Sequence, residues 1–139
     1  MKYIYIDNVM EFLKDLGSYD FQKLVWFEND QGLCSSFYED YFLLFDSTSL
    51  SDYIDAGEIV FGKEADKALK ELQAVCEAIP DKRSYAKDFI DSDEMKIIRE
   101  MVKRCLKLIR EYDGSETTVE FKDSGSPKLN ISFPDRDNL

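Results

Sequence analysis

The sequence predicts an α+β domain in which an antiparallel sheet of about five or six strands packs with three to four helices. The length of 139 residues is typical of a single domain. Segments rich in aromatic and β-branched residues lie mainly in the first and last thirds of the chain, and segments with a helical period fill the middle. Residues 1–139 are therefore expected to form one domain, with a loose tail over residues 134–139.

The N-terminal part is expected to contain a strand, a helix and two or three further strands. Residues 2–6 fit a strand, and residues 8–16 fit a helix because apolar side chains recur at i, i+3, i+4 and i+7. Residues 22–28 and 33–38 fit two strands joined by a glycine-containing turn. Residues 41–46 fit either a third strand or a continuation of the second.

The middle of the chain is expected to be helical. Residues 49–56 fit a short helix, and residues 65–79 fit a longer one that ends before Pro80. Residues 83–90 fit another helical turn or two. The longest helix is expected over residues 92–112, where the apolar side chains cover too wide an arc for one stripe. We therefore expect this helix to be central and covered on more than one side.

The C-terminal part is expected to return to strand. Apolar and polar side chains alternate over residues 118–122 and again over residues 129–133. The segment between them contains glycine, serine and proline, which favour a turn. The sequence therefore predicts a C-terminal β-hairpin.

The net charge of −11 is concentrated in the N-terminal part of the chain. Residues 1–60 contain twelve acidic and three basic residues, a net charge of −9. A field of this sign repels phosphate backbones and anionic membrane surfaces, so we expect neither nucleic acid nor membrane as a partner. No run of about 18 apolar residues could span a bilayer. The same field attracts basic proteins.

Three cysteines, Cys34, Cys76 and Cys105, show no C-x-x-C spacing. An odd number of thiols fits a reducing compartment, and buried, unpaired cysteines usually pack as small hydrophobic residues. The expected location is therefore cytoplasmic.

The chain contains no histidine, which excludes Ser-His-Asp and Cys-His catalysis and H-E-x-x-H zinc sites within it. No glycine-rich phosphate-binding motif is present, so no cofactor and no metal site are predicted. Acidic pairs such as Glu39 and Asp40 could serve glycoside hydrolysis, but such pairs are common in a chain with 29 acids.

Basic residues recur at spacings of three and four on the longest predicted helix. They fit either its solvated face or an internal counterpart of the acidic N-terminal half. This basic stripe consists of Lys96, Arg99, Lys103, Lys107 and Arg110.

These observations favour an acidic protein-binding module, in particular an inhibitor or immunity-type protein that neutralises a basic partner such as a toxin nuclease. An adaptor or a subunit of a homo-oligomer is one alternative, and an enzyme that uses carboxylates without histidine is another. Tyrosine and carboxylate side chains together can bind Arg and Lys. The predicted partner-binding residues are Asp30, Tyr38, Glu39, Asp40, Tyr41, Asp46, Asp52 and Asp55.

Overall fold

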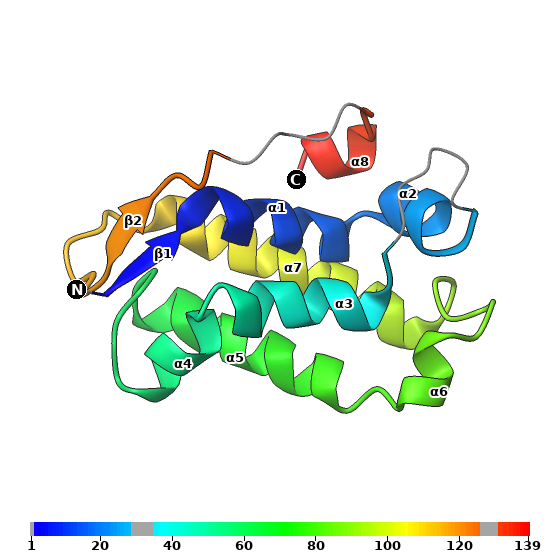
Figure 1. The fold of residues 1–139 in the computed structure, drawn as a ribbon, viewed down its shortest axis with the longest axis horizontal. Helices are drawn as coiled ribbons and strands as arrows, with labels where there is room; N and C mark the ends of the chain where they lie inside the picture. The colour runs from blue at the N-terminus through cyan, green and yellow to red at the C-terminus, as the bar shows by residue number, and fades with distance from the viewer. Residues whose placement is uncertain (1, 29–34, 126–130) are drawn as a thin grey trace.

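The computed structural model of the chain is mostly helical (Figure 1). It describes residues 2–28, 35–125 and 131–139. Within these residues the only strands are β1 (Tyr3–Tyr5) and β2 (Glu120–Lys122), which pair in parallel. The predicted α+β class with an antiparallel sheet of five or six strands is therefore wrong.

The other elements are helical. Two of them, η1 and η2, have the wider π-helical turn, in which the backbone hydrogen bond spans five residues. In chain order the helical elements are α1 (Ile6–Gly17), α2 (Tyr19–Phe21), η1 (Gln22–Glu28), α3 (Phe37–Phe42), η2 (Leu43–Ser47), α4 (Leu50–Asp55), α5 (Lys63–Glu77), α6 (Asp81–Ser84), α7 (Asp93–Glu111) and α8 (Pro134–Asp137).

Four helices lie where the apolar period predicted them. The helices expected over residues 8–16, 49–56, 65–79 and 92–112 are present as α1, α4, α5 and α7, each within three residues of the expected bounds. The helical turn expected over residues 83–90 is present in part, because α6 begins and ends earlier.

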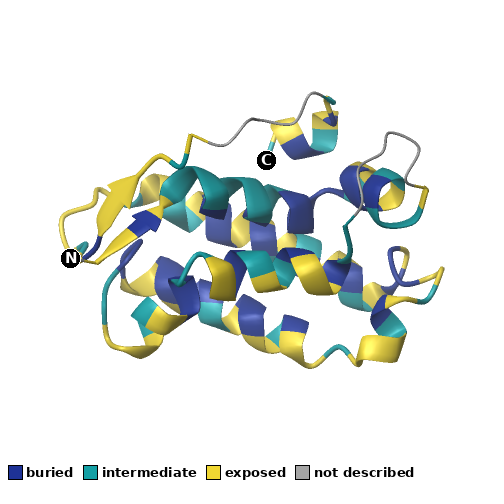
Figure 2. Ribbon diagram, in the orientation of Figure 1, coloured by how far each residue is buried: buried dark blue, intermediate teal, exposed yellow. Residues whose placement is uncertain are grey.

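The long helix α7 is central, since both α1 and α5 pack against it. Its buried side chains form one stripe, whereas Ile97 on another side remains 55% exposed. Figure 2 shows that α5 and α7 each have a buried side and an exposed side, whereas α1 is buried or intermediate along its whole length. The two neighbours therefore share one apolar stripe, which consists of Met95, Ile98, Val102, Cys105 and Leu106.

α1 and α7 approach each other closely at Gly17. A Cβ atom at this position would lie 2.8 Å from Val102 Cγ1 and 2.8 Å from Leu139 Cδ1. Carbon atoms of packed side chains prefer about 3.5–4.0 Å. The absence of a side chain at Gly17 therefore permits the contact between the two helices.

The strand predicted over residues 2–6 is present as β1, whereas the later segments predicted as strands in the N-terminal half are helical where the structure describes them. Residues 22–28 form η1, and residues 41–46 belong to α3 and η2. Of the strand predicted over residues 33–38, residues 33 and 34 lie outside the described residues, and α3 begins at Phe37. The predicted turn before it also lies outside the described residues.

Aromatic residues explain this error. Phe, Tyr and Trp have high β-propensity, but packing overrides propensity when a segment carries large apolar groups on several sides. As a helix, the segment buries Phe37, Leu44 and Phe45 toward α1 and α5. The helix begins at Ser36, whose hydroxyl accepts a hydrogen bond from the backbone N–H of Glu39 at 3.1 Å.

The predicted C-terminal hairpin is also wrong. β2 pairs with β1, from the other end of the chain, with Ile4 opposite Phe121. Residues 131–133 form no strand, and residues 126–130 lie outside the described residues. The buried side chains of Ile4 and Val119 join this small sheet to the main core.

The final residues, which the sequence suggested as a loose tail, contain α8 and a buried guanidinium. Arg136 Nε donates a hydrogen bond to Asp15 Oδ1 at 2.8 Å, and its Nη2 pairs with Glu11 Oε2. Only 8% of the Arg136 side chain is exposed. Residues more than 120 positions apart in the sequence are thus joined by a buried ion pair.

The α7 stripe generates the first prediction. Replacing Cys105, which is 1% exposed, with Asp places an unpaired carboxylate in the core and should lower the free energy of unfolding by several kcal/mol, on the order of 3–5. Ile97→Asp, on the exposed side of the same helix, should change it by less than about 1 kcal/mol. Urea unfolding measures both values. Equal effects of the two variants would show that α7 does not pack as described.

Candidate functional site

The candidate site is the outer side of α3 and η2, and the inward side chain of Asp40 determines which side that is. Asp40 is only 3% exposed. Its carboxylate accepts hydrogen bonds from Trp26 Nε1 at 2.7 Å and from Ser35 Oγ at 2.6 Å. Asp40 is therefore a structural residue, and its predicted role as an exposed partner-binding residue is corrected.

Burial changes the protonation of Asp40 and of its neighbour Asp15. Loss of hydration raises the pKa of Asp40 to about 6, although the hydrogen bonds from Ser35 and Trp26 lower it. Burial, reinforced by the nearby Asp40, raises the pKa of Asp15 to about 7. The ion pair with Arg136 acts in the opposite direction but is the smaller effect. Both carboxyl groups thus titrate near neutral pH.

Three aromatic rings lie together on the outer side of α3. Tyr38 and Phe42, which are 45% and 43% exposed, stack with their ring centroids 6.4 Å apart. Tyr41 packs edge-on against Tyr38 at 5.4 Å. Helical spacing of three and four residues brings these rings to one side, where they offer a rigid, partly apolar contact area.

Carboxylates surround this aromatic cluster. Burial raises the pKa of Tyr41, and the charges of Tyr38, Glu77, Cys76 and Asp46 raise it further, so both carboxylates act electrostatically on this residue. Glu39 is exposed beside Tyr38. Among the described residues, none of the three acids forms an ion pair with Lys or Arg within 4.0 Å. We call Tyr38, Glu39, Tyr41, Phe42, Asp46 and Glu77 the α3 acidic surface.

The other predicted site residues are dispersed. Asp30 lies outside the described residues. Asp55 on α4 forms an ion pair with Lys70 at 2.8 Å, so its charge is already compensated. Asp52 is exposed on the same helix. Of the eight predicted residues, the structure brings together Tyr38, Glu39, Tyr41 and Asp46.

Sequence reasoning missed two members of the surface, Phe42 and Glu77. The Phe42 ring reaches Tyr38 only if the segment is a helix, because residues four positions apart are neighbours in a helix but lie about 13 Å apart along a strand. Glu77 is the last residue of α5, and its charge acts on Tyr41 only because the fold brings α5 and α3 into proximity. A helical reading of residues 37–42 would have identified Phe42, whereas no local signal identifies Glu77.

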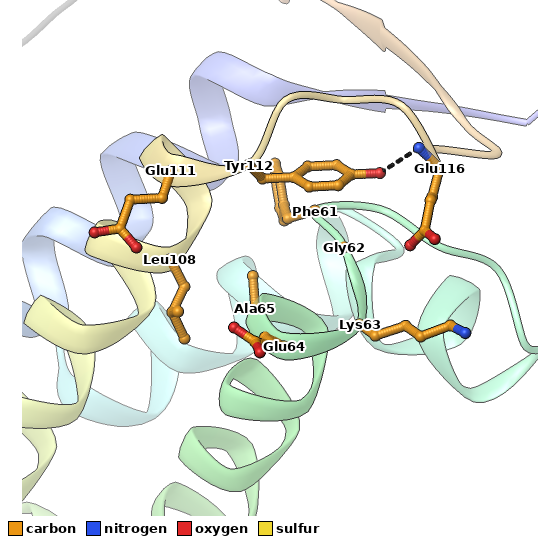
Figure 3. A pocket seen from close by; sticks show the side chains of 9 residues that line it. All are labelled: Phe61, Gly62, Lys63, Glu64, Ala65, Leu108, Glu111, Tyr112 and Glu116. Carbon is orange, nitrogen blue, oxygen red and sulfur yellow. Dashed lines mark hydrogen bonds between the residues drawn. The ribbon is translucent and has the colours of Figure 1, made fainter.

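A separate pocket of about 360 Å³ lies where the first turn of α5 meets the end of α7. Figure 3 shows Tyr112 across this pocket, with its hydroxyl accepting a hydrogen bond from the backbone N–H of Glu116 at 2.7 Å. Gly62 has φ +90°, and a Cβ there would lie 2.8 Å from the Tyr112 ring. Glu64, Glu111 and Glu116 give the pocket an acidic rim, at the opposite end of α5 from Glu77.

The cysteines offer no reactive thiol in the described part of the chain. Cys76 and Cys105 are unpaired and buried. Burial raises the pKa of both thiols, that of Cys105 to about 12, so neither forms the nucleophilic thiolate at neutral pH. Cys34 lies outside the described residues. Within the described ranges, no three acidic or cysteine side chains gather closely enough to hold a metal ion.

Two further searches bear on the site. Among the described helices, none combines the length and apolar character needed to cross a membrane. Comparison of the chain with family models, with characterised proteins and with solved structures found no match. The function proposed below therefore depends on the charge and geometry of the α3 acidic surface.

The raised pKa values generate the second prediction. Asp40 and Asp15 have pKa values of about 6 and 7 in the folded state, above about 3.9 in the unfolded chain. Between these values the folded state binds more protons, so the free energy of unfolding should fall as the pH rises through 6 and 7. We expect a loss on the order of 2–4 kcal/mol between about pH 5 and pH 8, measured by urea unfolding.

A pair of neighbouring substitutions tests the cause. Asp40→Asn removes the buried titrating group and should reduce this loss by about 1 kcal/mol. Glu39→Gln removes the same charge from an exposed position, where it adds only a minor part to the raised pKa of Asp40, and should change the slope much less. If the two variants have equal slopes, the pH dependence comes from the overall negative charge and not from the buried carboxyl groups.

Proposed function

We propose that this chain is an acidic protein-binding module that acts in the cytoplasm as an inhibitor or immunity-type protein and neutralises a basic partner, such as a toxin nuclease. The observation that carries this proposal is the α3 acidic surface, where exposed aromatic rings adjoin Glu39, Asp46 and Glu77 without an ion-pair partner in the described residues. Such a surface complements Arg and Lys side chains of a partner.

The residue types of the surface suit a basic partner. Carboxylates accept two parallel hydrogen bonds from an Arg guanidinium, and a Tyr ring binds a cation through its face. Tyr and Phe side chains have two rotatable bonds, so they contribute contact area at low entropic cost. A patch that offered only acids would attract many cations, whereas the adjoining rings favour Arg.

The overall charge supports the same proposal at longer range. With a net charge of −11, the chain attracts basic proteins before contact and repels nucleic acid. An inhibitor of a nuclease would thereby compete for the partner's basic substrate site. The absence of histidine removes the commonest general base from the chain, so a binding role explains the surface more simply than catalysis does.

Capture of the partner followed by substitution tests the proposal. The intact chain is immobilised on a support and exposed to a lysate of its source cell. We expect it to retain a basic protein in a stoichiometric complex. Glu39→Ala or Asp46→Ala should then weaken binding by about 1–3 kcal/mol, measured by calorimetry, without a change in stability above about 0.5 kcal/mol.

Two control variants make the result specific. Glu116→Ala removes an exposed acid from the pocket at the far end of α5, and Lys103→Ala removes a base from α7. Neither should weaken binding by more than about 0.5 kcal/mol. If Glu116→Ala weakens binding as much as Glu39→Ala, overall charge and not the α3 acidic surface is responsible. If Lys103→Ala has the larger effect, the partner binds the basic side of α7.

A further inference from the structure

We infer that the pocket between α7, the end of α1 and the segment after α8 binds a small organic oxyanion, with Arg99 as its principal ligand. The pocket has a volume of about 550 Å³. Its charge is opposite to that of the α3 acidic surface, because its charged lining is mainly basic. Its charged lining residues are Lys96, Arg99 and Lys103 on the basic side, and Glu100 and Asp135 on the acidic side.

Arg99 is a partly buried cation whose hydrogen-bond partners are neutral. Its Nη1 donates to Gln22 Oε1 at 2.8 Å, and its Nη2 donates to the Ile90 carbonyl at 3.1 Å. Its guanidinium lies over the Tyr19 ring, 5.2 Å from the centroid. Among the described residues, no carboxylate forms an ion pair with Arg99 within 4.0 Å.

The Arg99 guanidinium is therefore partly desolvated, and no carboxylate of the described residues is close enough to neutralise its charge. Loss of hydration lowers the pKa of Arg99, and the charges of Tyr19, Asp91 and Asp135 raise it only in part. A partly desolvated cation becomes more favourable when an anion reaches it. The guanidinium has five N–H donors, so the two hydrogen bonds above leave donors for an oxyanion.

Two lysines extend the basic lining along α7. Lys96 and Lys103 lie three residues before and four residues after Arg99, which places all three on one side of the helix. Each pairs with an exposed acid of its own helix, Lys96 with Asp93 at 4.0 Å and Lys103 with Glu100 at 3.0 Å. Exposed pairs of this kind contribute little stability, so both lysines can turn toward an anion.

The acid that faces the pocket from α8 is already engaged. Asp135 accepts hydrogen bonds from Ser18 Oγ at 2.5 Å and from the Asp20 backbone N–H at 3.1 Å. The nonpolar part of the lining comes from the Tyr19 ring and the Leu139 side chain. The volume exceeds that of a single inorganic ion, so the pocket suits a phosphate or carboxylate group attached to a small organic body.

Titration of the full chain by NMR tests this inference, with pyrophosphate and citrate as the two probes at constant ionic strength. Either probe should give saturable shifts of the Arg99 Nε–H and Gly17 N–H signals. Binding of pyrophosphate alone would assign the site to phosphates, and binding of citrate alone would assign it to carboxylates. If neither probe gives saturable shifts at these signals, the inference is wrong.

Substitutions on α7 provide the matched control. Lys96→Ala with Lys103→Ala should weaken binding at least tenfold, and both side chains are exposed, so folding should be preserved. Arg104→Ala with Lys107→Ala removes the same charge from the same helix outside the pocket and should weaken binding less than threefold. Equal losses in the two double variants would show that the anions respond only to overall charge.

Discussion

The buried guanidinium of Arg136 is the charge that joins α8 to α1, the helix against which both α7 and α3 pack. It pairs with Asp15 and Glu11 of α1, and its charge also acts on Asp40 of α3. One cation cannot neutralise three carboxylates in an interior of low polarity. Burial therefore raises the pKa values of Asp15 and Asp40, so bound protons neutralise part of the negative charge that Arg136 leaves uncompensated. The last helix is thereby joined to the first, against which α3 also packs.

This cluster also determines what α3 shows to solvent. Because the Asp40 carboxylate is held inside by Trp26 and Ser35, the helix can turn only one side outward. That side carries Tyr38, Glu39 and Phe42, and Asp46 follows one helical turn later in the π-helical η2. Wide helical turns of this type occur often at functional sites. The proposed binding surface thus depends on Asp40, a buried acid that is not itself part of that surface.

The amphipathic period of α1, α5 and α7 made these helices predictable from the sequence. The aromatic segment around α3 was instead predicted, wrongly, to form strands. Ser36 and Glu39 have the spacing of a capping box, a local helix signal that the β-propensity of the neighbouring aromatics concealed. Part of the candidate site could be predicted from the sequence, because the predicted residues Tyr38, Glu39 and Asp46 lie together in the structure. The burial of Asp40 could not be predicted, because its environment depends on packing with Trp26 and on Arg136, far along the chain.

Hydrogen exchange of the chain, alone and in complex with its captured basic partner, tests the central claim most directly. The account predicts that backbone amides of residues 36–47 and of the end of α5 exchange more slowly in the complex, because the partner covers the α3 acidic surface. Amides of α7 should exchange at the same rate in both states. Slower exchange along α7, with residues 36–47 unchanged, would place the partner on the basic side of the molecule and contradict the account.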